Sequence, residues 1–282
     1  MSASSVSTSP RPALTLNDGR ALPQVGLGLW RTPPEVAAEV VCAAIASGYR
    51  AIDTTAACEN EAGVGEGLRA CGAPREEVFV TTKLWNCDHG YGETLAAFDR
   101  SLKRLGLGYV DLYLIHWPVP SQGRYIDSWR AMIRLQEEGR VGSIGVCNFM
   151  IEHLRRIIGE TGAVPAINQN ELHPKFQQTE LRAFHAGQGI ATGSSSPLGQ
   201  GQCLKHPEIA RIAARHGKTP AQAVIRWHID SGLAVIPSSV HAERIAENVE
   251  VFDFKLDGED MAAIAALDDP TGRIGFDPVT FH

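Results

Sequence analysis

The chain has 282 residues, of which 44% are hydrophobic and 21% charged, and its formal net charge at pH 7 is −6. This composition is that of an ordinary globular protein, and the scattered Lys and Arg residues form no basic run that would neutralise a phosphate backbone. Nucleic acid is therefore excluded as an expected partner, and the lack of any run of 18 apolar residues excludes a predicted membrane span.

The N-terminal part of the chain predicts a tail followed by a hairpin. Residues 1–12 are rich in Ser and Pro and contain no apolar stretch like that of a signal peptide, so we expect a disordered tail on a cytoplasmic protein. Residues 14–23, LTLNDGRALP, place two short apolar runs around Asn17, Asp18 and Gly19. These three residue types tolerate positive φ in tight turns, which predicts a small β-hairpin.

Beyond residue 23, short apolar runs alternate with stretches of helical spacing, which is typical of βα units that build a parallel sheet. The candidate strands are QVGLGL, YRAIDT, VFVTTKL, VDLYLIHW, SIGVCN, AINQNEL, GIATGSS and LAVIPSS. The predicted helices cover 35–47, 62–71, 93–105, 125–138, 150–159, 178–187, 208–216 and 220–231. The glycine-rich GVGEG at 63–67 lies within a helical stretch, which argues against a dinucleotide-binding turn. We therefore predict one α/β domain over residues 13–282, a closed (β/α)8 TIM barrel preceded by the hairpin.

Polar or ionisable residues follow most of the predicted strands, at the end where such barrels build their active sites. Asp53, Lys83 and His116 end three successive strands, so we expect their side chains to converge in one cleft. A carboxylate, an ammonium and an imidazole that meet in a cleft shift one another's pKa values and can transfer protons. Any one of these residues alone is more simply interpreted as a cap or a satisfied polar group. The other strand ends carry Asn148, Gln169, Ser195, Ser238 and Ser239.

The cysteines and histidines give no sign of a metal site. The six cysteines are widely spaced, no C-x-x-C pair occurs, and the histidines are not clustered. This spacing predicts reduced thiols, with neither a zinc site nor a disulfide scaffold.

Several segments, in order along the chain, resemble segments of the aldo-keto reductases: AIDT, VTTKLWN, YLIHWP, SIGVCN, NQNELHP, SPLGQG and VIPSSVHAERIAENVEVFDF. The resemblance spans residues 14–270 and is greatest to the bacterial and plant branch that includes the diketogluconate reductases. It implies the barrel fold and an NADPH-dependent oxidoreductase that reduces aldehydes or ketones, such as keto sugars, to alcohols. The expected partner is a small carbonyl compound, and the expected form is a monomer.

The resemblance also implies roles for individual residues. In that family a tyrosine acts as the general acid, made acidic by a lysine paired to an aspartate and assisted by a histidine, and these partners match Lys83, Asp53 and His116. Residues that match the family's cofactor site are Asn148, Gln169, Leu198, Gly199, Ser239, Arg244 and Asn248. Aromatic residues that match the mouth of the substrate pocket are Trp30, Trp85, Trp117, Phe276 and Phe281, for which core filling is the alternative interpretation.

Three positions depart from the family pattern. Cys58 stands where the family has its catalytic tyrosine, and its shorter side chain would not reach a carbonyl placed for tyrosine. Ser195 replaces the aromatic residue that stacks on the nicotinamide, and Ser238 replaces a lysine that meets the cofactor's phosphates. Loss of that charge-assisted contact costs about 1.5 to 3 kcal/mol, which predicts weakened NADPH binding.

These exchanges all replace a large side chain by a small one within one pocket. They predict either a divergent family member adapted to another ligand or a deliberately engineered variant, with reduced or changed activity. The first hypothesis is an NADPH-dependent carbonyl reductase in which His116 and Lys83 stabilise the developing alkoxide. The second is a non-redox enzyme that uses Cys58 as a thiol nucleophile activated by Lys83 and His116, although most free cysteines are small, partly buried hydrophobic residues. The third is a nucleotide-binding scaffold without turnover.

Overall fold

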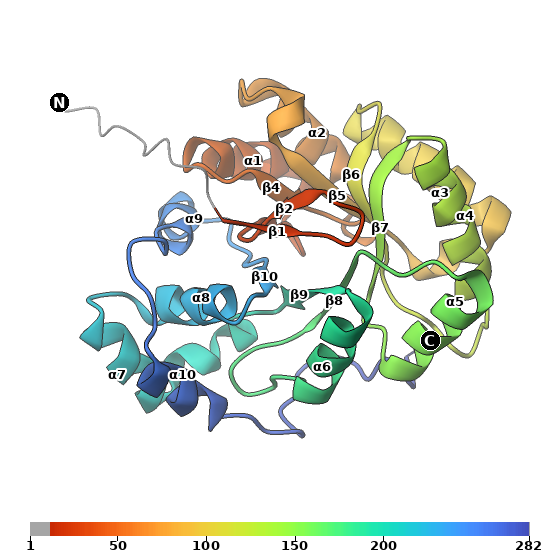
Figure 1. Cartoon of the computed structure of the whole chain (residues 1–282). Helices are drawn as coiled ribbons and strands as arrows, with labels where there is room; N and C mark the ends of the chain where they lie inside the picture. The colour runs from red at the N-terminus through yellow and green to blue at the C-terminus, as the bar shows by residue number, and fades with distance from the viewer. Residues whose placement is uncertain (1–11, 282) are drawn as a thin grey trace.

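Eight parallel strands form a closed barrel, as the alternating pattern predicted (Figure 1). The structure, a computed structural model, describes residues 12–281. Hydrogen-bonded neighbours follow chain order, and the parallel bridges Val25–Val235 and Gly28–Ser238 join the first strand to the last. The strands are β3 (Leu27–Gly28), β4 (Ala51–Asp53), β5 (Phe79–Leu84), β6 (Val110–Ile115), β7 (Val141–Cys147), β8 (Ile167–Glu171), β9 (Ala191–Ser195) and β10 (Ala234–Val235).

Helices connect successive strands and surround the barrel (Figure 1). Those that the sequence predicted begin and end within about two residues of the expected positions, and Thr219 caps the last of them by accepting the Gln222 backbone N–H at 3.3 Å. They are α1 (Ala37–Ala46), α2 (Glu61–Ala70), α3 (Tyr91–Leu105), α4 (Tyr125–Glu137), α5 (Ile151–Thr161), α6 (Thr179–Gln188), α7 (Pro207–Arg215) and α8 (Pro220–Asp230). Two further helices, α9 (Ala242–Val249) and α10 (Gly258–Ala265), were not among the predicted ones.

The predicted hairpin covers one end of the barrel (Figure 1). Its strands β1 (Ala13–Thr15) and β2 (Ala21–Pro23) pair in antiparallel register, and Leu16 and Leu22 are buried in a cluster with apolar residues of the barrel interior such as Leu112. The hairpin closes the barrel end opposite the carboxyl ends of the strands. The end at which such barrels build their active sites stays open. The predicted tail over 1–12 falls almost entirely outside the described residues.

The glycines of the GVGEG segment serve helix packing. The segment lies within α2, as predicted, and a Cβ on Gly65 would come within 1.9 Å of the Leu105 carbonyl oxygen. A Cβ on Gly67 would come within 2.7 Å of the Ala38 carbonyl oxygen. Glycine therefore lets α2 lie directly against its neighbouring helices.

All six cysteines lie among the described residues, and none of them forms a disulfide. Between residues 12 and 281, no helix is both long and apolar enough to cross a lipid bilayer.

A buried histidine connects α6 to two barrel strands. The Asn168 side-chain amide donates to His185 Nε2 at 3.0 Å, and His185 Nδ1 lies 2.8 Å from Thr192 Oγ1. Since Nε2 accepts, the imidazole is neutral and its hydrogen is on Nδ1, where it donates to the threonine. Burial lowers the pKa of His185 to about 4, which favours the same neutral form.

This histidine should make the stability of the protein depend on pH. In the unfolded chain it takes up a proton as the pH falls below about 6.5, whereas the folded protein resists until about 4, so folding is destabilised by about 2 kcal/mol at pH 5 relative to pH 7.5. Urea unfolding at both pH values should show that His185→Gln loses this share of the pH dependence. Substitution of the exposed His241 by Gln is the control, and an unchanged pH dependence in His185→Gln would contradict the assignment.

Candidate active site

A cavity of about 1260 Å³ opens at the carboxyl ends of the barrel strands. Its wall includes residues of β3, β4, β5, β8 and β9, residues that directly follow β6, β7 and β10, and residues 274–276 of the C-terminal segment. Most of the predicted site residues lie on its wall, including Asp53, Lys83 and His116. Cys58, Trp85 and Gly199 are not among the residues that line it, and their roles stay predictions.

Asp53 and Lys83 form a buried ion pair between neighbouring strands. The Lys83 ammonium donates to Asp53 Oδ1 and, at 3.2 Å, to the backbone carbonyl of Thr54. The Gln169 side-chain amide donates to the other carboxylate oxygen of Asp53 at 3.1 Å. A buried ion pair is stable only when such additional hydrogen bonds satisfy its remaining atoms. Lysine has three N–H donors, so one donor of Lys83 is left for the cavity that this residue lines.

His116 follows β6 and lies among three indole rings. Its ring meets Trp85 edge-on at a centroid distance of 5.1 Å and Trp30 at 5.8 Å, and it stacks near Trp117 at 6.4 Å. Burial lowers the pKa of His116 well below its ordinary value, and the charge of Lys83 lowers it further. The imidazole is therefore neutral at pH 7 and carries a single N–H.

Thr55 contacts His116 directly and was not among the predicted site residues. Thr55 Oγ1 lies 3.1 Å from His116 Nδ1 and accepts the backbone N–H of Ala57 at 3.3 Å. Among residues 12–281 the Thr55 hydroxyl hydrogen has no other acceptor, so its donation to Nδ1 satisfies both groups. This arrangement leaves the imidazole hydrogen on Nε2. Thr55 follows Asp53 by two residues near the end of the same strand, and this spacing could have predicted it from the sequence.

Cys58 lies in a single 3-10 turn, Ala56–Cys58, and is half-buried outside the cavity wall. Burial raises the pKa of its thiol, and this outweighs a hydrogen bond from the Arg31 backbone and the charge of Lys83, which lower it. The group is thus a protonated thiol at neutral pH. Because nucleophilic attack requires the thiolate, this environment argues against the second hypothesis.

The loop after β7 presents an amide to the cavity. Asn148 has a positive φ of 60°, and its side-chain amide donates to the His116 backbone carbonyl at 2.9 Å. Its side-chain oxygen is left facing a cavity that Ser195 and Leu198 also line. Gly199 has a positive φ of 56°, and a Cβ at that position would meet Cys203 Sγ at 2.5 Å.

The rim of the cavity near α9 has the chemistry of a phosphate site. Arg244 is exposed there and forms no ion pair with any carboxylate of residues 12–281. Ser239 Oγ accepts the His241 backbone N–H at 3.1 Å just before the helix begins, and Ser238 and Asn248 also line the cavity. An unpaired guanidinium beside a helix N-terminus attracts phosphate groups. These residues therefore fit the phosphorylated end of a nucleotide, with Ser238 adding no charge.

Aromatic side chains form the outer wall. Trp30 is half exposed and lines the cavity with Trp117, whereas Trp85 only packs against His116. Trp117 stacks on Phe281 at a centroid distance of 4.3 Å, and Phe281 lies 5.0 Å from Phe276. The C-terminal segment thus reaches back to the barrel mouth.

Glu171 is a second cavity residue that the sequence analysis did not select. It lies two residues after Gln169 in β8, and alternate residues of a strand point to the same side. The spacing from Gln169 could therefore have predicted Glu171 as a cavity residue.

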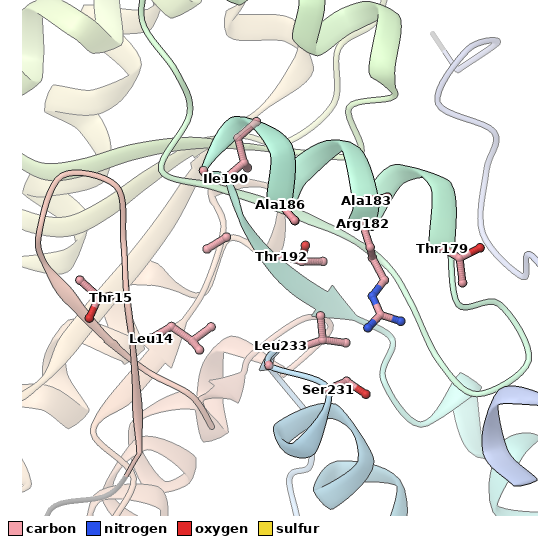
Figure 2. Close-up of a pocket in the computed structure, with 13 residues that line it drawn as sticks. Leu14, Thr15, Thr179, Arg182, Ala183, Ala186, Ile190, Thr192, Ser231 and Leu233 are labelled. Atoms are coloured by element: carbon pink, nitrogen blue, oxygen red, sulfur yellow. The ribbon is translucent and has the colours of Figure 1, made fainter. Parts of the chain in front are cut away.

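A second cavity, of about 660 Å³, lies beside the hairpin (Figure 2). Its lining includes Leu14 and Thr15 of the hairpin, Thr192 of β9 and Arg182 of α6, whose side chain points toward Ser231 in Figure 2. Arg182 is the one charged residue in this lining.

No group of three or more His, Cys, Asp or Glu side chains in residues 12–281 is arranged to hold a metal ion.

Comparison with known proteins gives consistent matches along nearly the whole chain. The model of the Aldo/keto reductase family matches residues 23–269. An aldo-keto reductase of Mycolicibacterium smegmatis is 56% identical over 272 residues, which cover 96% of this chain and 98% of that protein. The methylglyoxal reductase DkgA of Escherichia coli K12 is 51% identical over 270 residues, or 95% of this chain and 97% of that one. Among solved structures, a mutant of Gox0644 in complex with NADPH has a TM-score of 0.94 at 50% identity and covers 97% of this chain and 100% of its own.

The contact between Thr55 and His116 predicts a measurable change in the imidazole. In Thr55→Val, Nδ1 loses its hydrogen-bond donor, so its 15N resonance should move, and unfolding should cost about 1–3 kcal/mol less. Thr55→Ser keeps the hydroxyl and should retain the original spectrum. Two-dimensional 15N–1H NMR of the imidazole tests this, and an unchanged Nδ1 resonance in the valine variant would show that Thr55 does not hold the ring.

Proposed function

The chain belongs to the aldo/keto reductase family, and on that basis we propose that it is an NADPH-dependent reductase of small aldehydes and ketones. Similarity to a methylglyoxal reductase supports methylglyoxal-like carbonyls as substrates, and similarity to a protein solved with NADPH supports that cofactor. The observation that carries the proposal is the buried Asp53–Lys83 pair beside neutral His116, in the same cavity as the unpaired Arg244. The cavity is complete within one chain, which supports a monomer as the active form.

The cofactor would lie along the β7–β10 side of the cavity. Arg244, Ser239 and Asn248 would hold its adenosine end and 2′-phosphate, and Asn148 and Gln169 would face its nicotinamide end. Bound NADPH supplies a hydride to the carbonyl carbon. Ser195 and Ser238 add neither a ring nor a charge to this side, which supports weaker binding than in a site that has both.

The remaining groups act on the carbonyl oxygen. With Nδ1 engaged by Thr55, the Nε2–H of His116 is free to donate to that oxygen and to orient it. The Lys83 ammonium stabilises the negative charge that develops there. Its third N–H then transfers a proton to the alkoxide oxygen, so that hydride and proton together complete the alcohol. Asp53 holds Lys83 in place through the ion pair.

Cys58 stands where the family has its acid, and we propose that this exchange, natural or designed, reduces turnover. The thiol is half-buried, does not line the cavity and has a raised pKa, so it is placed neither to reach the carbonyl nor to attack it. Lys83 and His116 therefore act on the carbonyl oxygen without a phenol between them. The small residues Ser195 and Ser238, which line the cavity, leave room for a bulkier ligand.

Restoring the phenol should restore turnover. In Cys58→Tyr, kcat for methylglyoxal reduction should rise by about a hundredfold or more, because a positioned general acid contributes that much to such a step. Cys58→Phe supplies the same ring without the hydroxyl and should give no gain. NADPH oxidation followed at 340 nm measures both variants. Equal rates in the tyrosine and phenylalanine variants would show that the missing hydroxyl is not what limits this enzyme.

A cation restored at position 238 should strengthen cofactor binding. Ser238→Lys should lower the Kd for NADPH by about tenfold, because it adds a charge-assisted contact to a phosphate. Ser238→Met, of similar length but uncharged, should leave the Kd near the wild-type value. Fluorescence titration measures all three proteins in low and high salt. A gain that is equal in both variants, or that does not fall with salt, would contradict a phosphate contact at this position.

A further inference from the structure

Glu171 joins the C-terminal segment to the barrel. It ends β8 and is buried, and its two carboxylate oxygens accept successive backbone N–H groups: Ile274 at 2.6 Å and Gly275 at 2.7 Å. A Cβ on Gly275 would come within 2.7 Å of Glu171 Oε2, so an alanine at this position would force the carboxylate to shift. Hydrogen bonds from N–H groups to a carboxylate are among the strong ones in proteins.

The charge on Glu171 has a buried counterion. His173 Nε2 lies 3.2 Å from Glu171 Oε1, and His173 Nδ1 lies 3.7 Å from Cys203 Sγ. Burial alone would lower the pKa of His173, but the hydrogen bonds with Cys203 and Glu171 raise it to about 9. Burial would likewise raise the pKa of Glu171, but His173 and the two backbone N–H groups lower it. A carboxylate and an imidazolium therefore face each other beneath the segment.

Other contacts lock the same segment onto the loop after β8. The Lys175 carbonyl oxygen accepts the Asp269 backbone N–H at 3.2 Å and would lie 2.2 Å from a Cβ on Gly272. The Arg273 guanidinium lies over the Phe176 ring, 4.7 Å from its centroid. Residues 272–281 are thus attached near their start to the loop after β8, in the middle to Glu171, and at the end by the contact of the Phe281 ring with Trp117.

This segment forms one wall of the proposed substrate pocket. Ile274, Gly275 and Phe276 line the cavity together with Trp117 and with Glu171 itself. Phe276 is 67% exposed, so its own packing does not fix its place and the backbone beneath it must. Of the described residues, Glu171 is the side chain that bonds the backbone directly beneath Phe276.

We propose that Glu171 is a positioning residue that fixes residues 272–281 as the outer wall of the carbonyl pocket and thereby sets which carbonyl compounds the enzyme accepts. The proposal rests on the reductase function proposed above. Glu171 does not touch the reacting atoms and takes no part in proton transfer. A small carbonyl such as methylglyoxal is bound mainly by His116 and Lys83, whereas a bulky aromatic aldehyde depends on the wall. Release of the wall should therefore change KM for the bulky substrate and leave kcat for the small one.

Two variants test this from opposite sides of the contact. Glu171→Gln removes the charge and places an amide donor opposite a backbone N–H. Gly275→Ala keeps the Glu171 and His173 residues but adds a Cβ that displaces Oε2, so it tests the contact even if the first variant does not fold. Gly187→Ala, where an added Cβ meets nothing within 4 Å, is the matched control.

The first measurement is independent of activity. Hydrogen exchange by mass spectrometry should show the amides of Ile274 and Gly275 protected in the wild type and exchanging tenfold or more faster in both variants, with the control unchanged. Unchanged exchange in Gly275→Ala would overturn the proposal. If the wild type reduces no carbonyl compound at all, the proposed function fails, and this measurement still decides whether Glu171 holds the segment.

The second measurement separates positioning from general damage. With benzaldehyde, KM should rise about tenfold in Glu171→Gln and Gly275→Ala, whereas kcat for methylglyoxal and the Kd for NADPH should stay within about twofold of wild type. Equal losses with both aldehydes, or a matching loss of NADPH affinity, would show that Glu171 supports the barrel in general and does not set the wall.

Discussion

The ion pair between Lys83 and Asp53 is the constraint on which the site depends. Two charges taken out of water are stable together only when their geometry is good and their other atoms are hydrogen-bonded. The structure meets this requirement with the Thr54 carbonyl and the Gln169 amide, so that residues from three strands are fixed around one ammonium. Burial lowers the pKa of His116 and that ammonium lowers it further, so the imidazole is a neutral hydrogen-bond donor and not a charged group. The closed barrel is what brings these strand ends together.

Around this fixed centre the cavity carries small side chains at Ser195 and Ser238. Hydrogen bonds such as those of Asn148 and Glu171 hold the backbone of its wall. Under the proposed function, the groups at this centre polarise the carbonyl. We propose that the proton comes from Lys83, which lines the cavity and has one N–H donor left.

The sequence predicted the fold well because its signals are local. Alternating apolar runs and helical spacing identify strands and helices, and the polar residue at each strand end follows from barrel geometry, as Asp53, Lys83 and His116 show. The remaining features depend on contacts between distant residues. The Trp85 ring contacts that of His116, which follows the next strand, and Glu171 accepts backbone N–H groups of residues more than a hundred positions away. No spacing in the chain encodes those meetings, although the parity of Gln169 and Glu171 in β8 places both on one side.

The most direct test of the central claim is the turnover of methylglyoxal with NADPH by Lys83→Arg. Arginine keeps a cation next to Asp53, but its guanidinium holds its proton too tightly to act as an acid. The account predicts that kcat falls by at least about a hundredfold while the Kd for NADPH and the midpoint of urea unfolding stay close to those of the wild type. A kcat within about threefold of the wild-type value, measured on the folded variant, would contradict the role of Lys83 as the proton donor.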